Sequence, residues 1–182
     1  MSGHPHVVRL AHGAIDDCEH TFHDLAVRVL PGHMERLRTA LVTPWPALAF
    51  AQVGAGPKAI AAGFGLDGDF SGCYALVAGD RPVYVGISRS VLARVRQHVL
   101  GRSHFDASLA YLIAQRRLPT KGQRSKNMEL PEFRAAFASA QEYLRGLHVA
   151  TVRIDNPLEL HVFEACAAMA LGTAEWNSFR TH

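Results

Sequence analysis

Five side chains between positions 74 and 164 have types that suit phosphate chemistry. Tyr74, Tyr84 and Arg94 follow one another at intervals of ten residues, His98 lies four residues further on, and Glu164 comes much later. Arginine offers a permanently charged, planar fork for phosphate oxygens, and one glutamate can hold a hard divalent cation whose shell is completed by water. A tyrosine hydroxyl ionises more easily beside positive charge. Together these groups could cleave a phosphodiester.

The elements that must position them are a hairpin and a helix. Residues 73–77 and 82–85 are predicted strands, and Gly79-Asp80 is the turn between them. A helix follows to about residue 100, for which Ser88 or Ser90 is the expected cap. Its apolar face is formed by Val91, Leu92, Val95 and Val99. Arg94 and His98 are four residues apart, so they share another face, and we expect both to point into a cleft.

The remaining pattern predicts an α/β fold in which a central sheet of about three strands is flanked by helices. Helices are expected over 17–29, 33–42, 104–116, 131–146 and 158–171, and strands over 47–53 and 148–154. Pro31-Gly32 should stop the first helix, and 117–129 should be a polar loop. The composition shifts near 65–72. We therefore expect an N-terminal helical extension of unknown role over 1–65, and a functional domain over 66–182.

The chemical residues stand in a longer pattern. Gly72-Cys73-Tyr74 opens the first strand, Tyr84-Val85-Gly86 lies on the second, and Arg94, Glu164 and Asn177 follow in that order. This pattern resembles the GIY-YIG nuclease family, whose signature is two tyrosine-glycine motifs on adjacent strands, an arginine, a later glutamate and often a terminal asparagine. The resemblance covers about residues 72–180. Cys73 and Val85 replace isoleucines, and the long stretch between Arg94 and Glu164 suggests a helical insertion around 104–147.

The resemblance implies a metal-dependent endonuclease that hydrolyses nucleic acid, DNA rather than RNA, with Mg²⁺ or Mn²⁺. The implied catalytic residues are Tyr74, Tyr84, Arg94, His98 and Glu164, with Glu164 as the metal ligand. Either tyrosine could be the base. His161 could join Glu164 on the metal by its i, i+3 spacing, although mere adjacency is the simpler interpretation. Two alternatives stay open: an inactive nucleic-acid-binding module of the same fold, and an RNA-directed nuclease.

The distribution of charge also indicates a polyanionic partner. The whole chain carries a net charge of +3, but residues 81–126 hold ten Lys and Arg against one acid, Asp106, which makes +9 there and −6 elsewhere. Residues 116–126 resemble a basic loop that could clamp a phosphate backbone. The expected nucleic-acid contacts are Arg89, Arg96, Arg116, Arg117, Lys121, Arg124, Lys126 and Asn177.

Three scattered cysteines, Cys18, Cys73 and Cys166, form no CxxC pair, which argues against a disulfide framework and for a reducing compartment. No secretory signal is visible at the start of the sequence. The weakly charged stretch 44–66 is interrupted by prolines and glycines, so we expect a strand and a short helix there and no membrane span. The expectation is a cytoplasmic protein, and nothing in the sequence indicates its oligomeric state.

Overall fold

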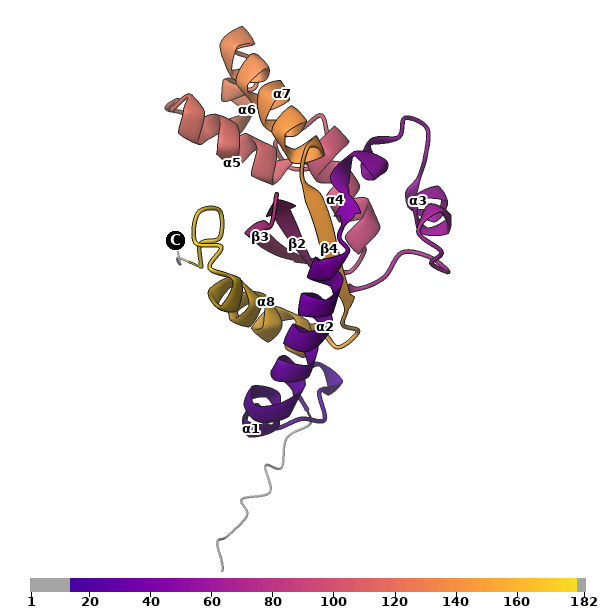
Figure 1. The fold of residues 1–182 in the computed structure, drawn as a ribbon. Helices are drawn as coiled ribbons and strands as arrows, with labels where there is room; N and C mark the ends of the chain where they lie inside the picture. Colours follow the sequence, from indigo (N-terminus) through magenta and orange to yellow (C-terminus); the bar gives the residue numbers. More distant parts are fainter. Residues whose placement is uncertain (1–13, 180–182) are drawn as a thin grey trace, which may run out of the picture.

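A four-stranded antiparallel sheet lies at the centre of the computed structural model, which describes residues 14–179 (Figure 1). The strand order is β1-β4-β2-β3. The strands are β1 (Trp45–Pro46), β2 (Gly72–Ala78), β3 (Arg81–Ser88) and β4 (His148–Arg153). The predicted α/β fold is confirmed. The fourth strand is the two-residue β1, which pairs with the start of β4.

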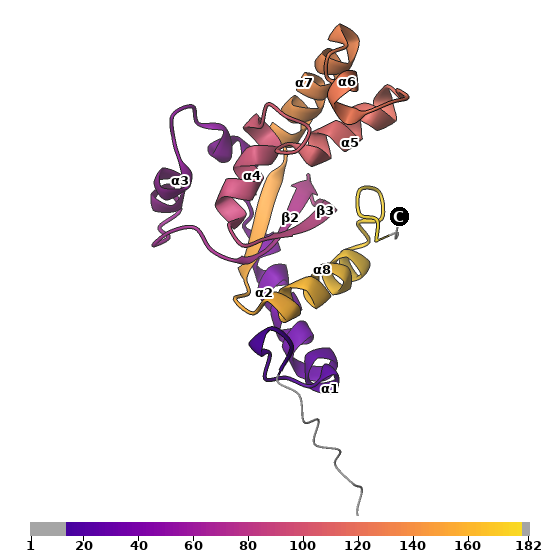
Figure 2. The same ribbon diagram turned by 180° about the vertical axis from the view of Figure 1, so that it is seen from behind.

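Helices cover both faces of the sheet. They are α1 (Phe22–Asp24), α2 (Leu30–Val42), α3 (Pro57–Gly63), α4 (Val91–Leu100), α5 (Ser108–Arg117), α6 (Arg124–Asn127), α7 (Pro131–Arg145) and α8 (Pro157–Leu171). One core forms where α2 and α8 pack on the sheet, and a second where α4, α5 and α7 pack on the opposite face. Figures 1 and 2 show these two groups of helices on either side of the strands.

The N-terminal helices share the core of the sheet. Leu25, Met34 and Leu37 are buried in the same cluster as Val85 and Phe163. The prediction that Pro31-Gly32 stops the first helix is wrong. A π-helical turn over Leu25–Val29 runs into α2, and Pro31 follows it in the first turn of α2.

Three other local predictions need correction. Residues 47–53 are not a strand, because Ala47–Ala51 form a 3-10 helix that buries Ala47 and Phe50; the apolar run is short enough to suit either structure. The helix expected from 104 begins only at Ser108, and the loop expected over 117–129 contains the short helix α6. Among the described residues, the structure contains no helix with the length and apolar character needed to span a membrane.

Candidate active site

The hairpin register places Tyr74 and Tyr84 on one face of the sheet. Tyr84 lies opposite Leu76, two residues from Tyr74 on β2, and side chains two apart on a strand point the same way. The two ring centroids are 6.1 Å apart. The meeting of the tyrosines, which the sequence resemblance implied, is thus a property of the β2–β3 pairing.

Gly86 makes room for the Tyr74 ring. Tyr74 and Gly86 are direct partners across the hairpin. A Cβ atom at position 86 would lie 2.5 Å from the Tyr74 hydroxyl oxygen and 2.6 Å from Cζ. Only glycine therefore lets the ring lie across β3, and this gives a physical reason for the glycine of the second motif.

Asp69 fixes the start of α4, the helix that carries Arg94 and His98. Its carboxylate accepts hydrogen bonds from the backbone N–H groups of Leu92 (2.8 Å) and Ala93 (3.0 Å). Ser90 occupies the N-cap position but makes no capping hydrogen bond with its side chain, so the expectation of a serine cap is wrong. Asp69 performs the same task from a preceding loop, because its acceptor oxygens meet the free N–H groups of the first turn.

His98 lies under the tyrosines and is not open to a cleft, which corrects the expectation from helix spacing. Its side chain is 1% exposed, its Nε2 lies 2.7 Å from the Tyr74 hydroxyl, and its ring meets that of Tyr84 edge-on at 6.0 Å. Burial, and then the charge of Arg94, lower the pKa of His98 to about 3. The imidazole is therefore neutral at physiological pH.

The second ring nitrogen of His98, Nδ1, decides which tautomer is present. Nδ1 is buried and has no partner among the described residues. A neutral imidazole has one donor and one acceptor nitrogen. A proton on Nδ1 would leave a buried donor unpaired, whereas a proton on Nε2 leaves only an unfilled acceptor. We therefore assign the proton to Nε2, which donates to the Tyr74 oxygen.

Arg94 is held on the side of the site that faces α5. Its Nη1 donates to the Asp106 carbonyl (2.8 Å) and to Gln97 Oε1 (3.1 Å), and its Nη2 donates to Ser108 Oγ (2.7 Å). These contacts use three of the five N–H donors of the guanidinium, and a side-chain hydrogen bond between Arg94 and Tyr74 lowers the pKa of that tyrosine. The sequence pattern did not single out Ser108, because nothing local connects it to a residue 14 positions earlier.

The two tyrosines differ in exposure and in electrostatics. Tyr74 is completely buried, and burial raises its pKa well above the usual value, with a further rise from Tyr84 and an opposing effect of Arg94. Tyr84 is only partly buried. Burial, and then the Glu164 carboxylate, raise the pKa of Tyr84, while Arg94 lowers it. Tyr84 is thus the tyrosine that solvent can reach and that Glu164 influences.

Glu164 projects from α8, which packs against β3 and begins at an Asn156 cap. The carboxylate is partly buried, and its burial raises its pKa, although the charge of His161 lowers it. No hydrogen bond or ion pair with a described residue compensates this burial. His161 is exposed and bonds the Pro157 carbonyl through Nδ1 at 2.8 Å. Residues 14–179 contain no group of three acidic, histidine or cysteine side chains placed to hold a metal.

Asn177 has a structural contact that the sequence pattern did not predict. Its side-chain amide donates to the Val85 carbonyl (2.8 Å) and accepts from the Val85 N–H (2.9 Å). Because β3 is an edge strand, these two bonds satisfy backbone groups that no further strand covers. Asn177 therefore ties the C-terminal segment to the residue next to Tyr84, and both ends of its amide are used in this contact.

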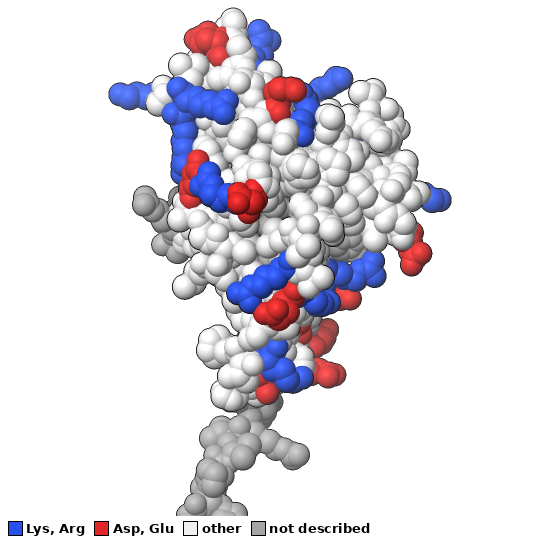
Figure 3. All heavy atoms as spheres, in the orientation of Figure 1, with Lys and Arg blue, Asp and Glu red and all other residues white. Residues whose placement is uncertain are grey.

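The basic residues fall into two groups. Arg96 donates to the Ala55 carbonyl, Arg117 donates to Ser139, and Lys126 pairs with Glu129 at 3.1 Å. The other four are exposed and have no hydrogen-bond or ion-pair partner among the described residues. They are Arg89 after β3, Arg116 over the Trp176 ring, Lys121 in the turn after α5, and Arg124 over the Tyr111 ring. Figure 3 shows Lys and Arg side chains over the α5–α6 end of the molecule, with some acidic groups among them.

Comparisons with known proteins add no relative: no family model, no curated protein and no solved structure matches the chain.

Proposed function

We propose that the protein is a nuclease that hydrolyses phosphodiester bonds by a mechanism of the GIY-YIG type. The observation that carries the proposal is the convergence of Tyr74, Tyr84, His98 and Arg94 on one face of the β2–β3 hairpin. Glu164 comes from α8, which packs against β3, and its charge raises the pKa of Tyr84. Two strands and α4 supply the four convergent groups, and α8 supplies Glu164.

Tyr84 is the better general base of the two tyrosines. It is partly exposed, whereas Tyr74 is enclosed and already bonded to His98. As a phenolate, Tyr84 would take a proton from water while the water oxygen bonds to phosphorus and the bond to the leaving oxygen breaks. Tyr74 and His98 then act as positioning residues, since they hold the base and the arginine in one fixed arrangement.

Arg94 would stabilise the charge that builds up on the phosphate. Its Nη1 and one Nη2 proton are anchored to Asp106 and Ser108, so the guanidinium plane is fixed before substrate arrives. The two N–H donors that these anchors leave over could bind phosphate oxygens beside Tyr74. Donors that are oriented in advance stabilise a transition state without reorganisation.

A divalent cation fits Glu164. The carboxylate is partly buried and has no described partner, which is unfavourable unless a positive charge binds there. One carboxylate, with water and substrate phosphate, is a typical binding set for Mg²⁺ or Mn²⁺. A cation bound there would offset the Glu164 charge that raises the pKa of Tyr84, and it would stabilise negative charge on the phosphate.

The proposed substrate is DNA and the proposed location is the cytoplasm. The exposed cations on α5, α6 and the turn between them support a polyanionic partner. Cys18, Cys73 and Cys166 are all free thiols, which suits a reducing compartment.

Incubation of the purified protein with plasmid, branched DNA and RNA, with Mg²⁺, Mn²⁺ or EDTA, tests the proposal. We expect metal-dependent cleavage of DNA that EDTA stops. Binding without cleavage of any of the three substrates, in either metal, would instead support the inactive binding module. Cleavage of RNA alone would establish the RNA-directed alternative.

A further inference from the structure

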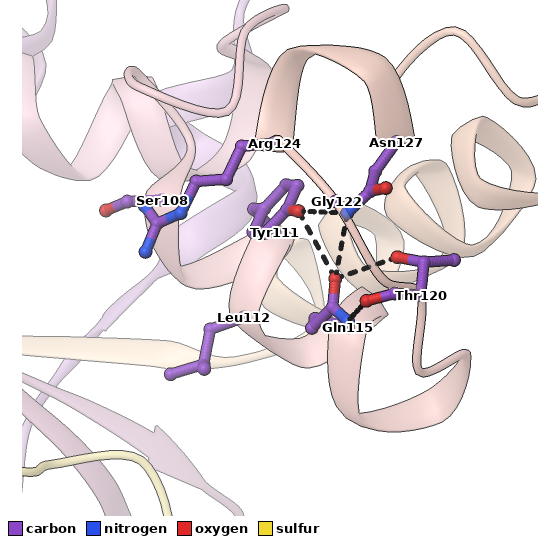
Figure 4. A pocket seen from close by; sticks show the side chains of 8 residues that line it. All are labelled: Ser108, Tyr111, Leu112, Gln115, Thr120, Gly122, Arg124 and Asn127. Carbon is purple, nitrogen blue, oxygen red and sulfur yellow. Dashed lines mark hydrogen bonds between the residues drawn. The ribbon is translucent and has the colours of Figure 1, made fainter.

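A polar pocket opens beside the Arg94 side of the site. It is formed by α5, the turn that follows and α6, and its volume is about 240 Å³ (Figure 4). Ser108, which accepts the hydrogen bond from Arg94 Nη2, forms part of its wall. The pocket is therefore separated by one side chain from the arginine that we propose holds the scissile phosphate.

An oriented hydrogen-bond network builds the pocket. Gln115 Nε2 donates to the Thr120 carbonyl at 2.7 Å, which fixes Gln115 Oε1 as the acceptor. That oxygen receives the Tyr111 hydroxyl (3.2 Å), the Thr120 hydroxyl (3.0 Å) and Asn127 Nδ2 (3.4 Å). Figure 4 shows these side chains joined in one network. Such a network holds its members in place before any ligand enters.

Two polar groups of the pocket are left without partners. Asn127 is 3% exposed, and its Nδ2 donates to the Tyr111 hydroxyl at 2.8 Å, but its Oδ1 accepts no hydrogen bond from a described residue. The Arg124 guanidinium lies 5.3 Å above the Tyr111 ring and likewise donates to no group within residues 14–179. The pocket thus offers a free acceptor and free donors beside an aromatic ring.

We propose that this pocket binds a single unpaired nucleobase of the substrate, next to the cleaved phosphate; the inference rests on the proposed nuclease function. A phosphate alone offers only acceptors and would leave Asn127 Oδ1 opposite another oxygen. A nucleobase edge offers both donors and acceptors. Its face can stack on the exposed Arg124 guanidinium, which itself covers the buried Tyr111 ring.

The pocket has room for a single base. Its volume of about 240 Å³ equals that of about eight liquid waters. A paired base would have to leave its stack to enter, and this costs least for a base that has no partner. The protein should therefore favour duplexes that carry a bulge, a flap or a frayed end.

The test compares binding of a fully paired duplex with binding of the same duplex carrying one bulged 2-aminopurine, in EDTA so that neither is cut. We expect the wild-type protein to bind the bulged duplex at least about tenfold more tightly, with a change in 2-aminopurine fluorescence, because the unpaired base avoids the cost of unstacking. The same pair of duplexes made of RNA shows which polymer supplies the base. Equal affinities for the paired and the bulged duplex in both polymers would overturn the proposal.

Arg124→Ala removes an exposed cation that lines the pocket. Lys126→Ala is the matched control, because it removes an exposed cation two residues later that does not line the pocket. We expect Arg124→Ala to reduce the preference for the bulge to less than about threefold, and Lys126→Ala to leave the preference unchanged. If Arg124→Ala weakens binding of both duplexes equally, Arg124 contacts only phosphate and the proposal fails.

Cleavage assays with Mg²⁺ on the same two duplexes separate this inference from the proposed function. If both are cut and bound equally, the nuclease proposal stands and the base pocket does not. If the bulge is preferred but neither duplex is cut, the pocket stands and the nuclease proposal does not.

Discussion

The hairpin with α4 and the segment of α5, α6 and α7 are organised in opposite ways. In the first region, the rings of Tyr74, Tyr84 and His98 lie against one another. Tyr74 and His98 are both buried and are hydrogen-bonded to each other. In the second, Arg116, Arg117 and Arg124 each lie over a different aromatic ring and remain exposed. Interdependent groups suit chemistry, whereas separate exposed charges suit binding to an extended polyanion.

This difference predicts which substitutions affect rate and which affect affinity. A change in the hairpin–α4 region should lower the cleavage rate steeply, because its groups depend on one another. A change in the α5–α7 segment should weaken binding in small, additive steps.

Among substitutions within these two regions, Arg94→Lys has the largest expected effect. Lysine keeps the charge but loses the planar fork and its anchors to Asp106 and Ser108. We expect kcat to fall by about 10²–10³-fold with little change in KM, measured by single-turnover cleavage of one defined duplex. A wild-type rate would make Arg94 an ordinary cation of the binding surface.

Gly86→Ala tests whether the packing of Tyr74 matters. The new Cβ would clash with the Tyr74 hydroxyl, so the ring must move away from His98. We expect a loss of about 1–3 kcal/mol in the free energy of unfolding, together with slower cleavage. Gly32→Ala is the matched control, because position 32 is helical and has nothing within 4 Å. If both variants are equally stable and active, the ring is not confined by Gly86.

His98 should make stability depend on pH. Its folded pKa of about 3 is lower than its ordinary value of 6.5, so between these two values the unfolded chain binds a proton that the folded chain does not. Stability should therefore fall as the pH drops from 6.5 toward 3, by up to about 1.4 kcal/mol per pH unit. Chemical denaturation across this range measures the free energy of unfolding at each pH. Its dependence on pH should be shallower for His98→Gln than for wild type, and identical dependences would contradict the burial of His98.

The smallest effect is expected from the basic residues of α6 and of the turn before it. Joint neutralisation of Lys121, Arg124 and Lys126 should weaken binding to all DNA sequences. It should also reduce the log–log salt slope by about 0.9 for each lost phosphate contact. Lys126 already pairs with Glu129, so we expect it to contribute least. An unchanged slope would show that this turn faces away from the substrate.

The sequence predicted the parts of the site that depend on short-range geometry. Strand alternation, a tight turn and helix spacing bring Tyr74, Tyr84 and Arg94 together within 21 residues of chain. The contacts that hold them there are distant in sequence and carry no local pattern. Asp69 caps a helix more than 20 positions later, and Asn177 bonds Val85 across 92 positions.

The burial of His98 escaped prediction for a different reason. The apolar spacing on α4 identifies Val91, Val95 and Val99 as the buried face and leaves His98 on a polar one. The two tyrosine rings that cover His98 come from the hairpin, so the pattern of the helix alone does not reveal them.

A single-turnover assay of wild type and Glu164→Gln on the same labelled duplex, with Mg²⁺, tests the central claim most directly. Glutamine keeps the shape of the side chain but removes the charge that would hold the cation. We predict that wild type cuts, that Glu164→Gln does not, and that both bind the duplex with similar affinity. Cleavage by Glu164→Gln at the wild-type rate would contradict a metal-dependent reaction at this site.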